Sequence, residues 1–438
     1  MNASWSHMLL GDLIELKRGY DLPKKQRVAG HVPLISSAGL SDCHDEAKVK
    51  GPGVITGRYG TIGEVFYIKD DFWPLNTTLY VKDFKGNHPK FIYYFLKTIN
   101  YLQFSDKAAV PGVNRNHLHK ASILVPLNID EQKQIAKILS DLDDKIHLNN
   151  QINQTLESIA QALFKSWFID FDPVRAKIAA KQEGKDPELA AMCAISGKCE
   201  EELHQMAEDD LAELRATAAL FPDEFVESEL GEVPKGWEVT LLKDAVTELR
   251  RGISPKYTEA LNSVIVINQR CIRNHTINFS LARKHDSSKR KIDGRELQIG
   301  DVLVNSTGVG TLGRIASVRY LDSITVVDSH VTVVRANDKK VSRAYLQGFL
   351  LENEKFIEAS GAGTTGQTEL RKEVLQEIKF PNPAVALHQQ FDSIIYKINQ
   401  EIASLEKMNI SLSHVRDTLL PKLLSGELDV SCVQDEVA

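Results

Sequence analysis

The chain has 438 residues, 42% hydrophobic and 26% charged, with a formal net charge of −6, as in an ordinary globular protein with room for two or three domains. No apolar run approaches the roughly 18 residues that a membrane span needs, and the N-terminus lacks the pattern of a secretory signal. The five cysteines form no CxxC pair, so we expect a cytoplasmic protein without a disulfide framework or a zinc site.

The first head, residues 1–125, mixes short β-rich runs such as Gly53-Val-Ile-Thr56 with glycine turns, which predicts an α+β domain. Its basic and amide side chains suit nucleic acid, because Arg matches guanine edges, Asn matches adenine edges and Lys contacts phosphate. Each of them could instead be an ordinary solvated residue. The candidate DNA-binding residues are Lys17, Arg18, Arg58, Tyr59, Asn114, Arg115 and Asn116.

A long helix is predicted over residues 126–170. Its inward-facing residues alternate in steps of four and three, which is a heptad seam. Such a helix either packs on the core of its own domain or pairs with another long helix, and its length favours pairing. The seam residues are Ile135, Leu139, Leu142, Ile146, Asn149, Asn153, Leu156, Ala160, Leu163 and Trp167.

Residues 171–229 form a predicted central linker that is acidic and partly helical. Residues 183–232 contain fifteen acidic and three basic residues, a net charge of −12, so the rest of the chain carries +6. An acidic run is more often a solvated surface than a binding site. The remaining positive charge permits a phosphate-facing surface elsewhere.

The second head, residues 230–383, repeats the first. Residues 5–12 match 237–244, residues 15–19 match 248–252, residues 60–63 match 310–313, and Leu118 matches Leu370, at offsets of 232, 233, 250 and 252. The order is kept while the offset grows, which indicates a duplicated unit whose second copy is longer by insertion, mostly between Gly252 and Gly310.

The second head has its own basic and amide-rich positions, and the pair Arg250-Arg251 recurs opposite Lys17-Arg18. The run Gly308-Val-Gly-Thr-Leu-Gly313 matches GxGxxG, but a predicted strand follows it where a dinucleotide site needs a helix. We therefore predict a glycine-rich turn between strands there, and the alternative is a glycine loop that lets the backbone approach a phosphate. The candidate DNA-binding residues are Arg250, Arg251, Asn268, Gln269, Arg270, Arg273, Lys289, Arg290, Lys291, Arg314 and Gln367.

A second long helix is predicted over residues 384–428, before a tail at 429–438. Its seam keeps the register of the first at an offset of 256, so Asn153 and Asn409 are equivalent. Two matched helices in one chain most simply pair with each other, antiparallel, as a spacer between two heads. The seam residues are Phe391, Ile395, Ile398, Ile402, Leu405, Asn409, Leu412, Arg416, Leu419 and Leu423.

Motifs for catalysis are missing from the sequence. It has no GxxxxGK[ST] loop, no HExxH or HxE…CxxC metal pattern, and no Asp/Asn-Pro-Pro-aromatic signature of adenine methyltransferases. This opposes a single-chain DNA methyltransferase or nuclease. A purely structural coiled-coil adaptor is the other alternative.

Three segments resemble the specificity subunits of type I restriction–modification enzymes. They are Phe164-Lys-Ser-Trp-Phe-Ile-Asp-Phe-Asp-Pro-Val-Arg-Ala-Lys177, Glu229-Leu-Gly-Glu-Val-Pro-Lys-Gly-Trp-Glu-Val239 and Leu419-Leu-Pro-Lys-Leu-Leu-Ser-Gly-Glu-Leu428. The resemblance covers about residues 5–430. It implies a non-catalytic chain with two target-recognition domains, each reading one half of a split site in double-stranded DNA, separated by a pair of long antiparallel coiled-coil helices.

The resemblance also implies partners and cofactors. Two methyltransferase (modification) subunits would carry S-adenosylmethionine for adenine methylation, and motor–nuclease (restriction) subunits would use ATP and Mg. No cofactor is expected in this chain. The first head is shorter than such a recognition domain usually is, and no base-contacting residue can be transferred from the resemblance.

Overall fold

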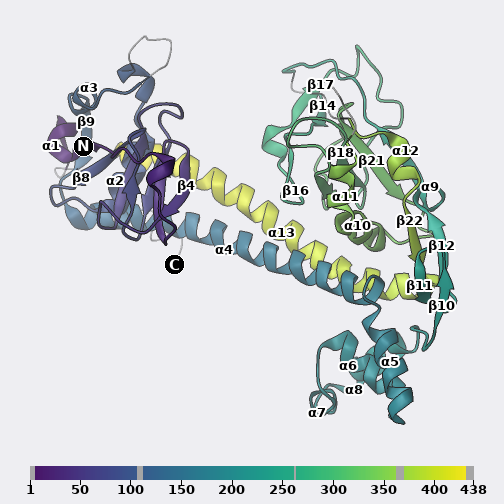
Figure 1. Ribbon diagram of the computed structural model, residues 1–438. Helices are drawn as coiled ribbons and strands as arrows, with labels where there is room; N and C mark the ends of the chain where they lie inside the picture. Colours follow the sequence, from purple (N-terminus) through teal and green to yellow (C-terminus); the bar gives the residue numbers. More distant parts are fainter. Residues whose placement is uncertain (1–4, 106–111, 261–262, 362–368, 431–438) are drawn as a thin grey trace. The chain divides into compact units, whose positions relative to one another are not determined.

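The computed structural model describes residues 5–105, 112–260, 263–361 and 369–430 (Figure 1). The chain divides into two compact units, residues 1–150 with 407–438, and residues 151–406. The two longest helices, α4 (Ile129–Phe168) and α13 (Val385–Leu424), have 40 residues each and contribute to both units. Each unit therefore combines one head with part of both helices.

The first head is built on an antiparallel sheet in the order β2-β8-β5-β6. A second sheet, β4-β3-β7, contains the parallel pair β3–β7, and β1 pairs with β9. The strands are β1 Trp5–Leu9, β2 Glu15–Arg18, β3 Val32–Ser36, β4 Gly39–His44, β5 Gly53–Gly57, β6 Val65–Ile68, β7 Trp73–Pro74, β8 Thr78–Asp83 and β9 Ser122–Pro126. The helices are α1 Leu10–Leu13, η1 Lys24–Gln26, α2 Pro89–Lys97, η2 Tyr101–Phe104 and α3 Arg115–His119.

Burial explains this arrangement. Every residue of β5 is buried, as expected for a central strand covered on both faces. Helix α2 begins with Pro89, whose fixed φ suits the first helical turn, and it buries Phe91 and Ile92 completely. The core of this unit also contains Leu423 and Leu424 of α13, so the end of the described chain completes the core of the first head.

The second head repeats these elements in the same order. Its main sheet is β13-β21-β18-β19, its second sheet is β17-β14-β20 with β14 and β20 parallel, and β12 pairs with β22. The strands are β12 Glu238–Leu241, β13 Val246–Arg251, β14 Val264–Ile267, β15 Ile272–Arg273, β16 Thr276–Ile277, β17 Arg283–His285, β18 Val302–Asn305, β19 Ile315–Ser317, β20 Thr325–Val327, β21 Val331–Ala336 and β22 Lys379–Asn382. The helices are α9 Leu242–Ala245, η3 Phe279–Leu281, α10 Arg343–Glu352, α11 Glu354–Ala359 and α12 Lys372–Gln376.

The predicted duplication is confirmed at the level of topology. Hairpin β15–β16 and helix η3 have no counterpart among the described elements of the first head, and they lie between Gly252 and Gly310, where the insertion is predicted. The repeated glycine also has a structural cause. A Cβ atom at Gly19 would lie 2.2 Å from the carbonyl oxygen of Leu75, and one at Gly252 would lie 2.0 Å from that of Val327. Only glycine allows the two backbone segments to approach each other this closely.

One predicted equivalence is wrong. Leu118 is buried in α3, whose counterpart is α12, so Leu118 corresponds to Leu375. Leu370 corresponds instead to Val113, because both donate a backbone hydrogen bond to the residue after the central strand: Val113 N–H to Arg58 O at 3.0 Å, and Leu370 N–H to Ser306 O at 2.8 Å. The last residues inserted in the second copy lie before Leu370. The match of Leu118 with Leu370 did not take them into account.

Both seams are confirmed, since no predicted seam residue is exposed. In the first unit, Asn149 of α4 donates to Asn409 of α13 at 2.9 Å, and Asp143 of α4 pairs with Arg416 of α13 at 2.7 Å. Numbers fall along one helix as they rise along the other, so the helices run antiparallel. In the second unit, Phe391 of α13 packs against the rings of Phe164 and Trp167 of α4.

The predicted linker contains a small packed group of helices in the second unit. These are α5 Asp172–Glu183, α6 Pro187–Ser196, α7 Glu200–Leu203 and α8 Glu208–Ala218, followed by hairpin β10 Phe225–Ser228 and β11 Gly231–Pro234. Their core contains Ala191, Met192, Leu203 and Ala218. The buried Lys177 ammonium bonds to Glu188 at 2.7 Å and to the Phe221 carbonyl at 2.8 Å. None of the described helices has the length and apolar character needed to cross a membrane.

A buried histidine makes the stability of the second unit dependent on pH. The His388 side chain donates from Nε2 to Asn382 at 2.8 Å, its Nδ1 has no partner among the described residues, and burial lowers its pKa to about 4. The folded state binds a proton at His388 more weakly than the unfolded state does. The free energy of unfolding therefore falls as the pH drops from the ordinary histidine pKa of 6.5 towards 4, by about 3 kcal/mol in all.

Gln132 occupies the equivalent position in α4, so His388→Gln is the matched substitution. We expect urea unfolding to show H388Q gaining stability relative to the unsubstituted chain between pH 7 and pH 4.5. Equal loss of stability in both proteins over that interval would contradict this assignment.

Candidate nucleic-acid interface

Six of the seven candidate residues of the first head line one groove of about 450 Å³, the first-head groove. Its lining contains three arginines, and none of the described lining residues is acidic. Excess positive charge in a concave surface attracts phosphate. The lining residues are Arg18, Arg58, Tyr59, Leu79, Gly112, Val113, Asn114, Arg115 and Asn116.

The end of the central strand β5 positions two of these side chains. The backbone N–H groups of Arg58 and Tyr59 both donate to the carbonyl of Thr77, at 2.8 and 3.2 Å. The Arg58 guanidinium lies 4.3 Å from the centre of the Tyr59 ring. Gly112 lies against the same ring, and a Cβ atom there would be 2.2 Å from Tyr59 Cε1. The Tyr59 ring therefore packs closely against Gly112, and it holds Arg58 by a cation–π contact.

Helix α3 presents the next two side chains. Its anchor is the fully buried Leu118, and the side-chain oxygen of Asn114 caps it by accepting from Asn116 N–H at 3.0 Å. Arg115 and Asn116 in its first turn are exposed. Asn114 is thus partly committed to the cap, whereas Arg115 and Asn116 can reach a ligand.

His119 ties this helix to strand β2. Its Nε2 accepts from the backbone N–H of Leu16 at 2.9 Å. Burial, reinforced by the positive charges of Arg115 and Lys85, lowers the pKa of His119 and keeps the ring neutral for this bond. The sequence did not single out His119 for this role. Lys17, the seventh candidate, does not line the groove, and its ammonium lies 5.5 Å from the centre of the Tyr20 ring.

The equivalent position in the second head has a different electrostatic character. Ser306 and Thr307 replace Arg58 and Tyr59, and their hydroxyls bond to Thr332 at 2.5 Å and to His330 at 2.7 Å. Arg251, the counterpart of Arg18, pairs with Glu369 at 2.5 Å and donates to the Leu370 carbonyl at 2.9 Å. This surface is therefore polar rather than strongly basic. The glycine loop of the second head has two extra residues. For this reason the comparison of the two sequence repeats did not align Ser306 and Thr307 with Arg58 and Tyr59.

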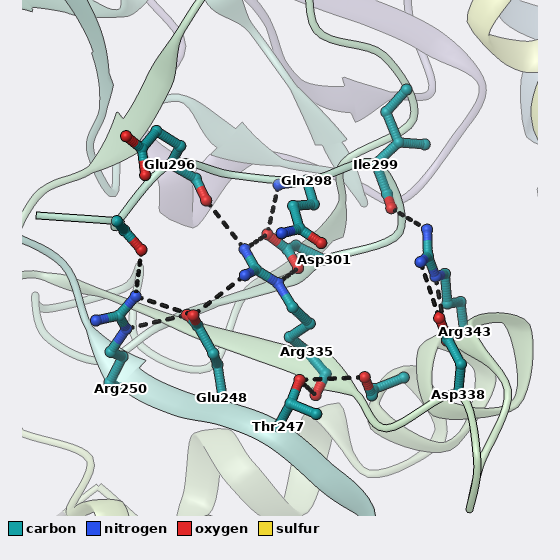
Figure 2. Close-up of polar contacts among 12 residues, drawn as sticks. Thr247, Glu248, Arg250, Glu296, Gln298, Ile299, Asp301, Arg335, Asp338 and Arg343 are labelled. Carbon is teal, nitrogen blue, oxygen red and sulfur yellow. Dashed lines mark hydrogen bonds and ion pairs between the residues drawn. The ribbon is translucent and has the colours of Figure 1, made fainter.

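Arg250 belongs to an internal network of the second head. Figure 2 shows Glu248 between Arg250 and Arg335, at 2.9 and 3.1 Å. Arg335 also forms a two-bond pair with Asp301, both bonds at 2.7 Å, and Asp301 is almost fully buried. The Arg250 side chain donates in addition to the Gly294 carbonyl at 2.8 Å. The charge of Arg250 is largely compensated within the head. Arg250 is therefore a weaker candidate for contact with DNA than its recurrence opposite Lys17 suggested.

Two further candidates gather at the glycine-rich loop between the antiparallel strands β18 and β19, so the predicted turn is confirmed. Gly308, Gly310 and Gly313 all have positive φ. The side-chain amide of Gln269 lies beside Gly308, and the backbone carbonyl of Gln269 accepts from the Asn305 side-chain amide at 3.0 Å. Arg314 donates to the Gly310 carbonyl at 2.7 Å. The neighbouring Arg270 is exposed, while the Asn268 side chain accepts from its backbone N–H at 2.9 Å.

The other candidates of the second head do not join this group in a common pocket. Arg273 lies in hairpin β15–β16, whose turn residue His275 pairs with Glu354 at 2.8 Å. Lys289, Arg290 and Lys291 are exposed after β17, and Arg290 donates to the Ser254 carbonyl at 3.0 Å. Gln367 lies outside the described residues. In the part of the chain that the structure describes, no group of His, Cys, Asp or Glu could hold a metal ion.

Comparison with known proteins gives a consistent family. Residues 2–158 and 234–412 match the family described as "Type I restriction modification DNA specificity domain". The type I restriction enzyme HindI specificity subunit of Haemophilus influenzae is 32% identical over 78% of this chain and 77% of its own length. The MjaIX specificity subunit of Methanocaldococcus jannaschii is 25% identical over 90% of this chain and 82% of its own length.

A solved structure shares the fold. The S subunit of a type I restriction–modification system from M. genitalium superposes with a TM-score of 0.54 at 16% identity, covering 97% of this chain and 96% of that one. The likeness supports two α+β domains with long central helices.

The first-head groove yields a test by charge removal. Replacing Arg58 and Arg115 with Ala should weaken binding to duplex DNA and reduce the slope of log affinity against log salt by roughly 1.8, since each lost phosphate contact removes about 0.9. The matched control replaces Lys185, between α5 and α6, and Lys198, between α6 and α7, which removes the same charge from the acidic segment. Equal salt slopes for R58A/R115A and the unsubstituted chain would remove the groove from the interface.

Proposed function

Because this chain belongs to the family of type I restriction–modification specificity subunits, which are not catalytic themselves, we propose that it reads a bipartite site in double-stranded DNA, one half with each head. The duplication supports this proposal most strongly. Both heads contain a four-stranded sheet, a three-stranded sheet and a terminal strand pair in the same order, each on an antiparallel part of α4 and α13. Two copies of one reading domain suit two half-sites.

The proposal assigns different chemistry to the two halves. The first-head groove offers three arginines beside an aromatic ring, a set suited to phosphates and guanine edges. The equivalent surface of the second head offers hydroxyls, His330 and the exposed Arg270 near the glycine loop. Side chains this different would read different base sequences, so the whole site would be asymmetric.

We assign residues 1–125 and 230–383 to the two target-recognition domains and residues 126–170 and 384–428 to the spacer helices. Forty helical residues extend about 60 Å at 1.5 Å per residue. A pair of such helices with a buried seam is stiff, so it would set the number of base pairs between the half-sites.

Catalysis would then belong to other subunits. Two modification subunits with S-adenosylmethionine would methylate adenine within the recognised site, and restriction subunits with ATP and Mg would translocate and cut DNA. The acidic helices α7 and α8 are unsuited to contact with DNA phosphates, because most of their charged side chains carry the same sign of charge.

Exchanging one head tests the division of labour. The first head should be replaced by that of another member of the family, with α4 and all later residues kept, and the methylated sites should be mapped by sequencing. We expect one half-site to change while the other half-site and the gap stay the same. A change in both half-sites would contradict independent reading by the two heads.

A further inference from the structure

A buried arginine connects the second head to both long helices within the second unit. Arg319 follows strand β19, and only 4% of its side chain is exposed. Its guanidinium pairs with Glu157 of α4 at 2.7 Å and with Glu406 of α13 at 3.2 Å, and its Nε donates to Asn399 of α13 at 3.4 Å. We call these four residues the Arg319 cluster.

The cluster is better suited to fixing a position than to adding stability. Removing three charged groups from water largely offsets the attraction between them, so buried ion pairs contribute little net stability. Burial raises the pKa of Glu406, which reflects this desolvation. A planar guanidinium satisfies two carboxylates only in one geometry. Sliding the head by one helical turn, about 5.4 Å, would leave all three charges buried and unpaired.

Packing beside the cluster supports the same position. Gly348 of α10 lies against the ring of Phe164 of α4, and a Cβ atom at Gly348 would be 2.3 Å from Phe164 Cδ2. Phe164 also contacts Tyr345, with ring centres 5.3 Å apart. Helix α10 therefore packs against α4 at Gly348, where α10 has no side chain. A shift of α10 along α4 would lose this packing.

The first unit has different polar contacts at the equivalent place. There Asp143 of α4 accepts from the Tyr94 hydroxyl at 2.7 Å and pairs with Arg416 of α13 at 2.7 Å. By the offset of 256, Asn399 takes the place of Asp143 and Ala160 that of Arg416. Asn150 and Ser413 stand at the places of Glu406 and Glu157, so the two ion pairs of the Arg319 cluster have no counterpart in the first unit.

We propose that Arg319 is a positioning residue that fixes the second head at one place along the helix pair, and thereby restricts the DNA sites to a single gap length. The inference rests on the proposed bipartite reading. It adds a named determinant of gap length that is separate from the residues that touch DNA.

The test uses the full chain in complex with its modification subunits and maps methylated sites by sequencing. In the Arg319→Met variant we expect unchanged half-sites and methylation of sites whose gap differs by one base pair to rise about tenfold, the order of one mismatch penalty. Arg319→Lys keeps the charge but cannot satisfy both carboxylates, so we expect an intermediate rise.

Two further variants separate position from stability. Arg319→Met combined with Glu157→Gln and Glu406→Gln leaves no buried charge unpaired, so it should fold like the unsubstituted chain and still accept the altered gaps. Arg335→Met breaks the buried arginine–carboxylate network of Figure 2, which lies wholly inside the second head. It should lower the unfolding temperature without changing the gap.

The possible outcomes are distinct. A single unchanged gap in the triple variant would overturn the role of Arg319 while leaving bipartite reading intact. Broadened gaps in both Arg319→Met and Arg335→Met would also overturn it, because general loosening would then be the cause. An undivided methylated motif from the unsubstituted chain would overturn the proposed function and this inference together.

Discussion

The antiparallel pairing of α4 and α13 is the interaction on which both units depend. In the first unit, Ile135 and Leu139 of α4 share a core with Leu423 and Leu424 of α13. In the second unit, Phe164 and Trp167 of α4 share a core with Phe391 and Ile395 of α13. Each head therefore completes its core with residues from the helix of the other copy. Hydrophobic burial, at about 25 cal/mol per Å² of apolar surface, makes this exchange favourable.

Polar residues break the symmetry of that pairing. A strictly duplicated seam would let either helix pair with a copy of itself, but Arg416 of the second helix faces Asp143, whereas the first helix has Ala160 at the matching place. The Arg319 cluster adds a second difference, and Asn149 bonded to Asn409 adds a third. Polar groups within an apolar seam cost stability and gain specificity of register. The two copies have therefore diverged at matching positions of the seam.

Much of this architecture could be predicted from the sequence, because it depends on local periodicity. The seams, the duplicated strands and the glycine turn all follow from spacing, and the groove brings together six residues chosen by type. Long-range partners were not predictable. Arg319 meets carboxylates 162 and 87 positions away, and Glu248 meets Arg335 only because β13 pairs with β21. The acidic segment was underestimated as a linker, since its small core has no strong periodicity.

We propose that the helix pair acts as a ruler between two reading domains, and one measurement tests this most directly. Seven residues with the seam pattern should be inserted after residue 150 in α4 and after residue 406 in α13, which lengthens both helices by roughly 10 Å. The methylated sites of the complex should then be mapped by sequencing. If the helix pair is the ruler, we expect unchanged half-sites with a gap about three base pairs longer, at some 3.4 Å for each base pair. An unchanged gap would contradict it.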